Sequence, residues 1–142
     1  MVGVGGVLVH EGRVLLIRRG KEPLYGRWVV PGGTVERGET LEAALVREMK
    51  EETDLEVKPL ELLTVFDRIE RDPGGDVRYH YVILDYLCEY VSGTARAGSD
   101  ALAVAFARPD ELESFDLPEK ALEVVRGALA RVSARGLALP PR

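Results

Sequence analysis

Apolar residues occur along the chain in short runs and alternating segments that are typical of β-strands. Strands are expected over residues 2–9, 14–18, 28–30, 60–71, 77–90 and 101–108. The first two are joined by Glu11-Gly12, and the two long ones by a run from Asp72 to Asp76 that contains Pro73. These turn residues predict two hairpins. One face of the second long strand carries Val82, Leu84, Tyr86, Cys88 and Tyr90, an alternation that predicts one buried face.

Two other segments carry apolar residues at helical spacing. The first runs from about Thr40 to Thr53, with Thr40 as a suitable N-cap, and the second runs from Pro118 to Arg135. The apolar stripes are Leu41, Ala44, Leu45 and Met49 in the first, and Leu122, Val125, Leu129 and Val132 in the second. A helical turn is expected over 109–114 and a loop over 91–100. Two helices interleaved with these strands predict an α/β fold whose helices cover a mixed sheet.

The size and charge of the chain restrict its class. A chain of 142 residues suits a single domain, which we place at residues 1–136, followed by a loose C-terminal tail at 137–142. The formal net charge of −5 argues against binding to a nucleic-acid polymer. Cys88 is the one cysteine and is expected to be a buried strand residue in a reducing, cytoplasmic environment. Apolar runs are too short for a membrane span.

The first helix also carries a cluster of carboxylates. Glu48, Glu51 and Glu52 fall within about one third of the helix circumference. Like charges so placed repel one another unless a cation neutralises them, and oxygen-rich sites suit Mg²⁺ or Mn²⁺. The alternative is a solvated surface on which Arg47 pairs with Glu51. The preceding Pro31-Gly32-Gly33 segment is expected to form a turn.

The spacing of residues in this region resembles that of the Nudix box, G-x5-E-x7-R-E-U-x-E-E-x-G-U, in which U is a bulky apolar residue. The matching positions are Gly33, Glu39, Arg47, Glu48, Met49, Glu51, Glu52 and Leu55. The flanking Pro31-Gly32 and Gly38-Glu39-Thr40 also look like the family. Asp54 departs from the pattern, because the family has a glycine there. A left-handed residue commonly ends a helix at such a position, and aspartate tolerates that conformation better than most residues.

The resemblance implies a Nudix-type α/β/α sandwich with a mixed sheet and two main helices. It also implies a hydrolase that cleaves a nucleoside diphosphate linked to another moiety with the help of Mg²⁺ or Mn²⁺. By resemblance, the backbone carbonyl of Gly32 and the carboxylates of Glu48, Glu51 and Glu52 hold the metal, and Arg47 pairs with Glu39. Glu51 or Glu48 is favoured as the general base. Asp100, on the loop before the last strand, is a third candidate.

The resemblance does not decide which small nucleotide is the substrate. An ADP-ribose-like substrate is favoured, and Pro73, beyond the box, weakly supports the ADP-ribose pyrophosphatase-like branch. The alternatives are a nucleotide-sanitising enzyme that acts on modified nucleoside triphosphates, and a non-catalytic sensor domain. A homodimer is a further expectation. Two basic groups are candidates for contacts with a substrate, with solvated charge as the alternative for each: Arg18, Arg19 and Lys21 in the first, and Arg68, Arg71, Arg78 and His80 at the long hairpin, which could also shape a dimer contact.

Overall fold

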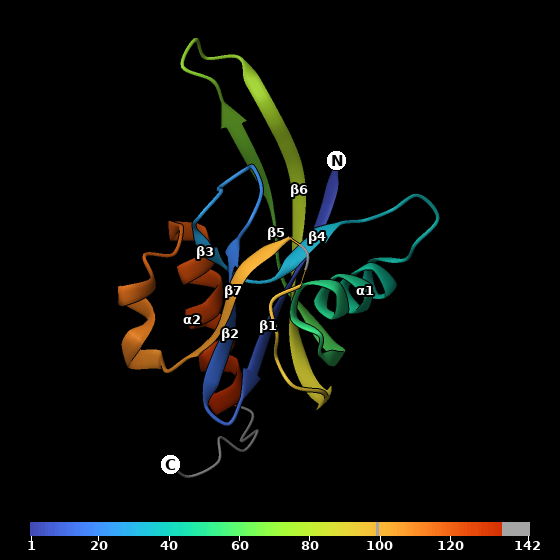
Figure 1. The fold of residues 1–142 in the computed structure, drawn as a ribbon, viewed down its shortest axis with the longest axis vertical. Coiled ribbons are helices and arrows are strands. Elements are labelled where there is room, and N and C mark those ends of the chain that lie inside the picture. Colours follow the sequence, from blue (N-terminus) through green and yellow to red (C-terminus); the bar gives the residue numbers. More distant parts are fainter. Residues whose placement is uncertain (99, 135–142) are drawn as a thin grey trace.

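The computed structural model describes residues 1–98 and 100–134 (Figure 1). The expected domain end at residue 136 and the expected tail at 137–142 therefore lie outside the described residues. The strands are β1 (Val2–His10), β2 (Arg13–Arg19), β3 (Trp28–Val29), β4 (Gly32–Thr34), β5 (Glu56–Arg71), β6 (Val77–Ser92) and β7 (Ala101–Ala107). The helices are α1 (Leu41–Thr53), the 3₁₀-helix η1 (Pro109–Phe115) and α2 (Glu119–Ala134). Both predicted hairpins and both predicted helices are confirmed.

The strands form one mixed sheet of seven strands in the order β3-β2-β1-β6-β5, with β4 on β1 and β7 on β2. Its centre is the parallel pair of β1 and β6, in which Gly5 lies beside Asp85. Gly5 also lies beside Gly32 of the antiparallel strand β4. β1 therefore brings together residues that are far apart in the sequence, since Gly5 lies next to both Gly32 and Asp85. Periodicity within either strand carries no sign of this pairing.

The two main helices cover opposite faces of the sheet (Figure 1). The core under α1 includes Leu15, Tyr86 and Cys88, and the core under α2 includes Leu16 and Leu87. The predicted α/β/α sandwich is thus confirmed, and so is the burial of Cys88, which is 2% exposed. The expectation of a single buried face on β6 is wrong for residues 85–88, because both faces are covered there. Among the described residues, no helix is long and apolar enough to span a membrane.

Both ends of α1 are set by local interactions that the sequence indicates. Thr40 is the N-cap, and its side-chain oxygen accepts a hydrogen bond from the backbone N–H of Ala43 at 3.1 Å. The helix ends at Asp54, which has the left-handed conformation with φ 62° and ψ 20°. The Asp54 carboxylate also accepts a hydrogen bond of 2.6 Å from Arg96. This contact joins the loop after β6 to the end of α1. A glycine at position 54 could not make it, because it has no carboxylate.

The expectation of a turn at residues 31–33 is wrong, because Gly32 and Gly33 belong to strand β4. They are required by close packing rather than by a left-handed backbone. A Cβ atom on Gly32 would lie 2.0 Å from the carbonyl oxygen of Val4, and one on Gly33 would lie 2.2 Å from Oε2 of Glu48. The two glycines let β4 fit between β1 and α1, and this fit brings the backbone of β4 against the carboxylates of the helix.

Asp54→Gly is expected to have opposing effects on stability. Glycine relieves the left-handed strain, which is worth about 1 kcal/mol, but the exposed contact with Arg96, worth about 0–1 kcal/mol, is lost. In an Arg96→Ala background the contact with Arg96 is already absent, so Asp54→Gly brings the relief and loses only the exposed ion pair of Asp54 with Lys50 at 3.3 Å. Asp54→Gly should therefore stabilise the protein more in that background than in the wild type. The measurement is a double-mutant cycle by urea denaturation, and equal or reversed effects in the two backgrounds would contradict this account.

Candidate functional site

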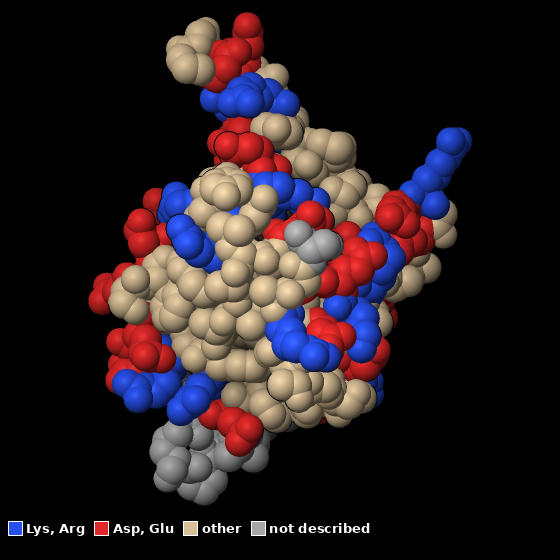
Figure 2. Space-filling model, viewed as in Figure 1, with Lys and Arg blue, Asp and Glu red and all other residues tan. Residues whose placement is uncertain are grey.

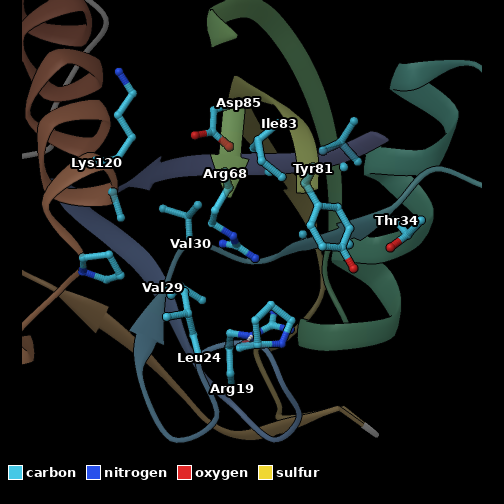
Figure 3. Close-up of a pocket in the computed structure, with 18 of the residues that line it drawn as sticks. Arg19, Leu24, Val29, Val30, Thr34, Arg68, Tyr81, Ile83, Asp85 and Lys120 are labelled. Carbon is cyan, nitrogen blue, oxygen red and sulfur yellow. Dashed lines mark hydrogen bonds between the residues drawn. The ribbon is translucent and has the colours of Figure 1, made fainter. Parts of the chain in front are cut away.

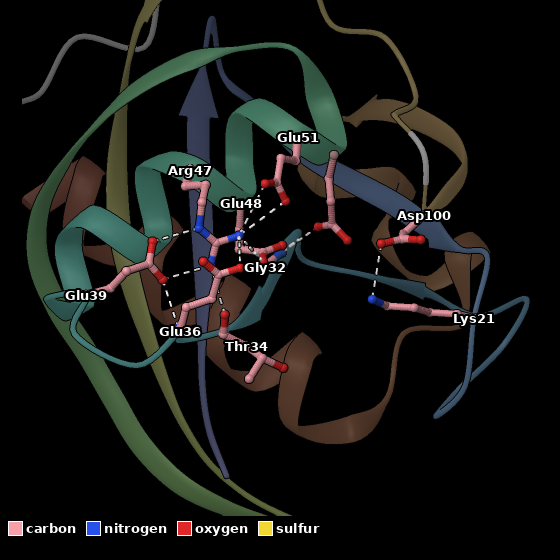
Figure 4. Close-up of polar contacts among 10 residues, drawn as sticks. Lys21, Gly32, Thr34, Glu36, Glu39, Arg47, Glu48, Glu51 and Asp100 are labelled. Carbon is pink, nitrogen blue, oxygen red and sulfur yellow. Dashed lines mark hydrogen bonds and ion pairs between the residues drawn. The ribbon is translucent and has the colours of Figure 1, made fainter.

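Arg47 is the centre of a polar network between α1 and the segment that precedes it (Figure 4). Its Nε and Nη2 donate to the two carboxylate oxygens of Glu39 at 2.7 and 2.9 Å. Its Nη1 donates to Glu48 at 2.7 Å and to Glu51 at 3.2 Å, and its Nη2 also reaches the carbonyl oxygen of Thr34 at 3.0 Å. The planar guanidinium, with five donors in a fixed fork, suits this role where lysine would not. The structure thus places Arg47 against Glu39, as the sequence resemblance implies.

Glu39 is held as a carboxylate by this network. The hydrogen bonds from Arg47 and from the backbone N–H of Glu36 lower the pKa of Glu39 to about 2. The same acceptors raise the pKa of Arg47 above its already high value. Both groups stay charged throughout the physiological range. Glu39 and Arg47 therefore fix the loop of residues 35–39 to the helix.

Glu52 is buried and Glu48 is half-buried at the junction of α1 and β4. The Glu48 side chain is 14% exposed and Glu52 is 4% exposed. Oε1 of Glu52 accepts a hydrogen bond of 2.8 Å from the backbone N–H of Gly32. Burial raises the pKa of Glu52 to about 7, with a further rise from Glu48 and a partial offset by the Gly32 hydrogen bond. Burial also raises the pKa of Glu48, against the lowering effect of Arg47. Two carboxylates are thus held where negative charge is unfavourable.

The two other candidate bases are more exposed. The side chain of Glu51 is 53% exposed and reaches Arg47. Asp100 pairs with Lys21 at 3.1 Å, and its side chain is 49% exposed. Figure 4 places Asp100 and Lys21 apart from the Arg47 network. The structure therefore brings Glu48, Glu51 and Glu52 to one end of α1 and leaves Asp100 on a neighbouring loop.

The donor set fits a hard divalent cation. Carboxylate oxygens next to the backbone of Gly32 are the ligand type that Mg²⁺ prefers, and a cation would relieve the unfavourable burial of Glu48 and Glu52. In the described part of the chain, no three acidic, histidine or cysteine side chains already converge on one point. Arg47 instead contacts Glu48 and Glu51. A cation shared by all three carboxylates would therefore compete with Arg47 for the oxygens of Glu48 and Glu51.

A cavity of about 250 Å³ opens beside Gly32 and Gly33 (Figure 3). It lies over the sheet face that α2 covers farther along, and the start of α2 forms part of its wall. Its charged lining residues include Arg19, Lys21, Arg68, Asp85 and Lys120. On the face of the molecule seen in Figure 2, basic and acidic side chains are interspersed rather than gathered in a patch of one sign. The cavity thus combines cationic groups with the backbone of β4.

Sequence reasoning found part of this cavity. Arg19 and Lys21 belong to the basic run that is a candidate for phosphate contacts, with solvated charge as the alternative, and Arg68 is one of the hairpin candidates. The other hairpin candidates have local partners: Arg71 donates to Gly75, Arg78 lies over Tyr79, and His80 contacts Asp67. Asp85 was missed. Its signal is its position as the lone charged residue in the apolar run from Val82 to Cys88.

Arg47→Ala is expected to destabilise the protein. It leaves Glu39 and the half-buried Glu48 without their cationic partner, and breaking a partly buried pair costs about 2 kcal/mol or more. Arg37→Ala, an exposed residue on the same loop, is the control and should be close to neutral. Urea denaturation of both variants tests this. Equal stability of Arg47→Ala and the wild type would show that the network does not brace the site.

Glu52 should give the metal-free protein a pH-dependent stability. Its pKa is about 7 in the folded protein against an ordinary value of 4.5. The folded state therefore binds the proton more tightly, and this contribution is present below pH 4.5 and is lost as the pH rises to about 7. The loss should be about 3 kcal/mol. Glu52→Gln should remove this pH dependence. In EDTA, the free energy of unfolding of the variant should therefore rise relative to that of the wild type between about pH 5 and about pH 8. A constant difference would contradict the raised pKa.

Comparison with known proteins places this site in a family. The family model described as the NUDIX domain matches residues 1–128. A Methanocaldococcus jannaschii protein named ADP-ribose pyrophosphatase is 40% identical over 116 residues, which cover 82% of this chain and 62% of that protein. A Streptomyces ambofaciens MutT-like protein is 38% identical over 78% of this chain and 66% of its own length. The chain thus spans about two thirds of these relatives.

The structural comparison agrees. A MutT NUDIX hydrolase from Burkholderia pseudomallei has a TM-score of 0.71 and 34% identity, and the match covers 92% of this chain and 96% of that protein. The match over residues 1–128 includes the whole region from Gly32 to Leu55. The chain therefore belongs to the Nudix hydrolase family.

Proposed function

We propose that this chain hydrolyses the diphosphate bond of a nucleoside diphosphate linked to another moiety, with ADP-ribose as the favoured substrate and Mg²⁺ or Mn²⁺ as the metal. The observation that carries this proposal is the buried carboxylate of Glu52 and the half-buried carboxylate of Glu48, beside the backbone of Gly32. A cavity with several cationic side chains opens beside this backbone. Such an arrangement suits an anionic substrate that is bound together with a cation.

The metal would be held by Glu48, Glu51 and Glu52 together with the backbone carbonyl of Gly32. When bound, a divalent cation supplies charge neutralisation for the diphosphate and lowers the pKa of water. Arg47 is a positioning residue, because it reaches Glu48 and Glu51 while it is anchored on Glu39. Its loss would let the carboxylates separate, with a matching loss of rate.

Glu51 is favoured as the general base. It is the most exposed of the three box carboxylates, so an attacking water can reach it from solvent. Its carboxylate would take the proton from that water as the bond to phosphorus forms. Glu48 is the second candidate. Asp100 is the least favoured, because it lies on a neighbouring loop, apart from the Arg47 network, where it pairs with Lys21 (Figure 4).

One of the relatives supports the favoured substrate. The archaeal relative at 40% identity is named ADP-ribose pyrophosphatase, and the proposal carries that substrate to this chain. Arg19 and Lys21 line the cavity beside Gly32 and Gly33 and are placed to neutralise phosphate oxygens. The experiment is a panel of nucleotides incubated with the protein and Mg²⁺. The proposal expects AMP and ribose 5-phosphate from ADP-ribose, whereas preferred release of monophosphate from nucleoside triphosphates would overturn the favoured substrate.

Glu51→Gln and Glu52→Gln are expected to lower kcat by about 100-fold or more, with folding retained. A neutral amide is a poor ligand for a hard cation and a poor proton acceptor. In Glu52→Gln the side-chain amide oxygen could still accept the hydrogen bond from Gly32. Glu42→Gln, in the first turn of the same helix, is the matched control and should leave kcat unchanged. Turnover with saturating Mg²⁺ and thermal melts of all three variants provide the test.

Two outcomes would overturn this assignment of roles. Full turnover in excess EDTA would show that the reaction does not need a divalent cation. Equal rates for the wild type, Glu51→Gln and Glu52→Gln would show that the carboxylate cluster has no part in the reaction.

A further inference from the structure

Asp85 is a buried carboxylate that faces the cavity (Figure 3). It is 3% exposed and lies on β6 beside Gly5 of β1. Within residues 1–98 and 100–134, its side chain has no hydrogen-bond or ion-pair partner. A Cβ atom on Gly5 would lie 2.2 Å from Oδ1 of Asp85. The glycine therefore provides the room that this carboxylate occupies.

The nearby cations do not satisfy this carboxylate. Arg68 lies over the ring of Tyr81, with its Cζ 5.8 Å from the ring centroid, and Lys120 lies over the ring of Phe66 at 5.3 Å. Burial raises the pKa of Asp85 to about 6, although Arg68 and Lys120 act in the opposite direction. A buried carboxylate without hydrogen bonds destabilises the fold. Its position in the lining of a cavity points to a ligand that supplies the missing donors.

The sheet register places Asp85 at a defined distance from the phosphate end of the cavity. Gly5 lies between Gly32 on one side and Asp85 on the other. Neighbouring strands are about 4.8 Å apart, so Asp85 lies roughly 10 Å from Gly32. A nucleotide with its phosphates beside Gly32 would have to place its ribose in this interval. Its base would then reach the region of Asp85.

The cavity walls near Asp85 suit a planar ring. Val30, Phe66 and Ile83 line the cavity, and Val30 comes within 3.4 Å of the position that a Cβ on Gly5 would take. Apolar walls with one polar group at a fixed point are typical of sites that orient a small ligand. The polar group here can only accept hydrogen bonds when it is ionised. It would therefore select a ring edge that carries N–H donors.

We propose that Asp85 determines the base specificity of this chain by accepting a hydrogen bond from the exocyclic amino group of a purine nucleobase. The inference rests on the proposed function, because it takes the cavity as the nucleotide site. A base without that amino group would leave the carboxylate buried and unpaired, and a site of this kind discriminates strongly against such an analogue. Asp85 is thus a binding residue at the far end of the substrate from the reacting bond.

The test measures binding and not turnover, so that its failure can be distinguished from a failure of the proposed hydrolysis. Calorimetric titrations of the full chain in EDTA use two matched pairs of 5′-monophosphates. AMP is compared with purine riboside monophosphate, which lacks the 6-amino group, and GMP with IMP, which lacks the 2-amino group. The amino member of at least one pair should bind about tenfold more tightly or better.

Three variants identify the group responsible. Asp85→Leu keeps the size of the side chain but removes both acceptor oxygens, and it should bring the affinities within each pair to near equality. Asp85→Asn keeps an acceptor oxygen and should retain the preference, which a purely electrostatic role for the carboxylate would not allow. Asp67→Leu replaces a 65% exposed aspartate on the long hairpin and is the control. Equal binding of the pairs by the wild type, no binding of any of the four, or a preference that survives Asp85→Leu would overturn the proposal.

Discussion

The site depends on the contact of the Arg47 guanidinium with carboxylates that would otherwise repel one another. Arg47 donates to Glu39, Glu48 and Glu51 and to the carbonyl oxygen of Thr34. The Arg47 guanidinium thus joins the helix, the loop before it and strand β4. Ion pairs on a surface contribute little to stability, whereas a partly buried network with several acceptors is costly to break. The same network fixes the positions of the carboxylates before any ligand binds.

Strand β4 connects this network to the cavity lined by Arg19, Lys21 and Asp85. Its two glycines allow the backbone to approach both β1 and Glu48, and Gly32 donates its N–H to Glu52. The acidic groups come from the helix on one face of the sheet, and the cavity lies over the other face, with β4 between them. A side chain at either glycine would separate the two halves of the site. The glycines are therefore needed because they allow β4 to pack closely against β1 and Glu48, and not because they form a turn.

The sequence predicts the helices, the hairpins and the box carboxylates because each depends on spacing within one segment. The pairing of β1 with β6 could not be predicted this way, since it joins residues about eighty positions apart. Strand β4 was also missed, because glycines disfavour strands and only the packing of Val4 and Glu48 against them explains their presence. Asp85 becomes meaningful only when the pairing places it in the cavity.

We propose that the clustered carboxylates of α1, which are Glu48, Glu51 and Glu52, bind a divalent cation. The most direct measurement is a titration with Mn²⁺ followed by electron paramagnetic resonance, without substrate, on the wild type, Glu52→Gln and Glu42→Gln. The account predicts saturable binding that is weakened about tenfold or more in Glu52→Gln and is unchanged in Glu42→Gln. Absence of saturable binding by the wild type, or equal affinity of all three proteins, would contradict it.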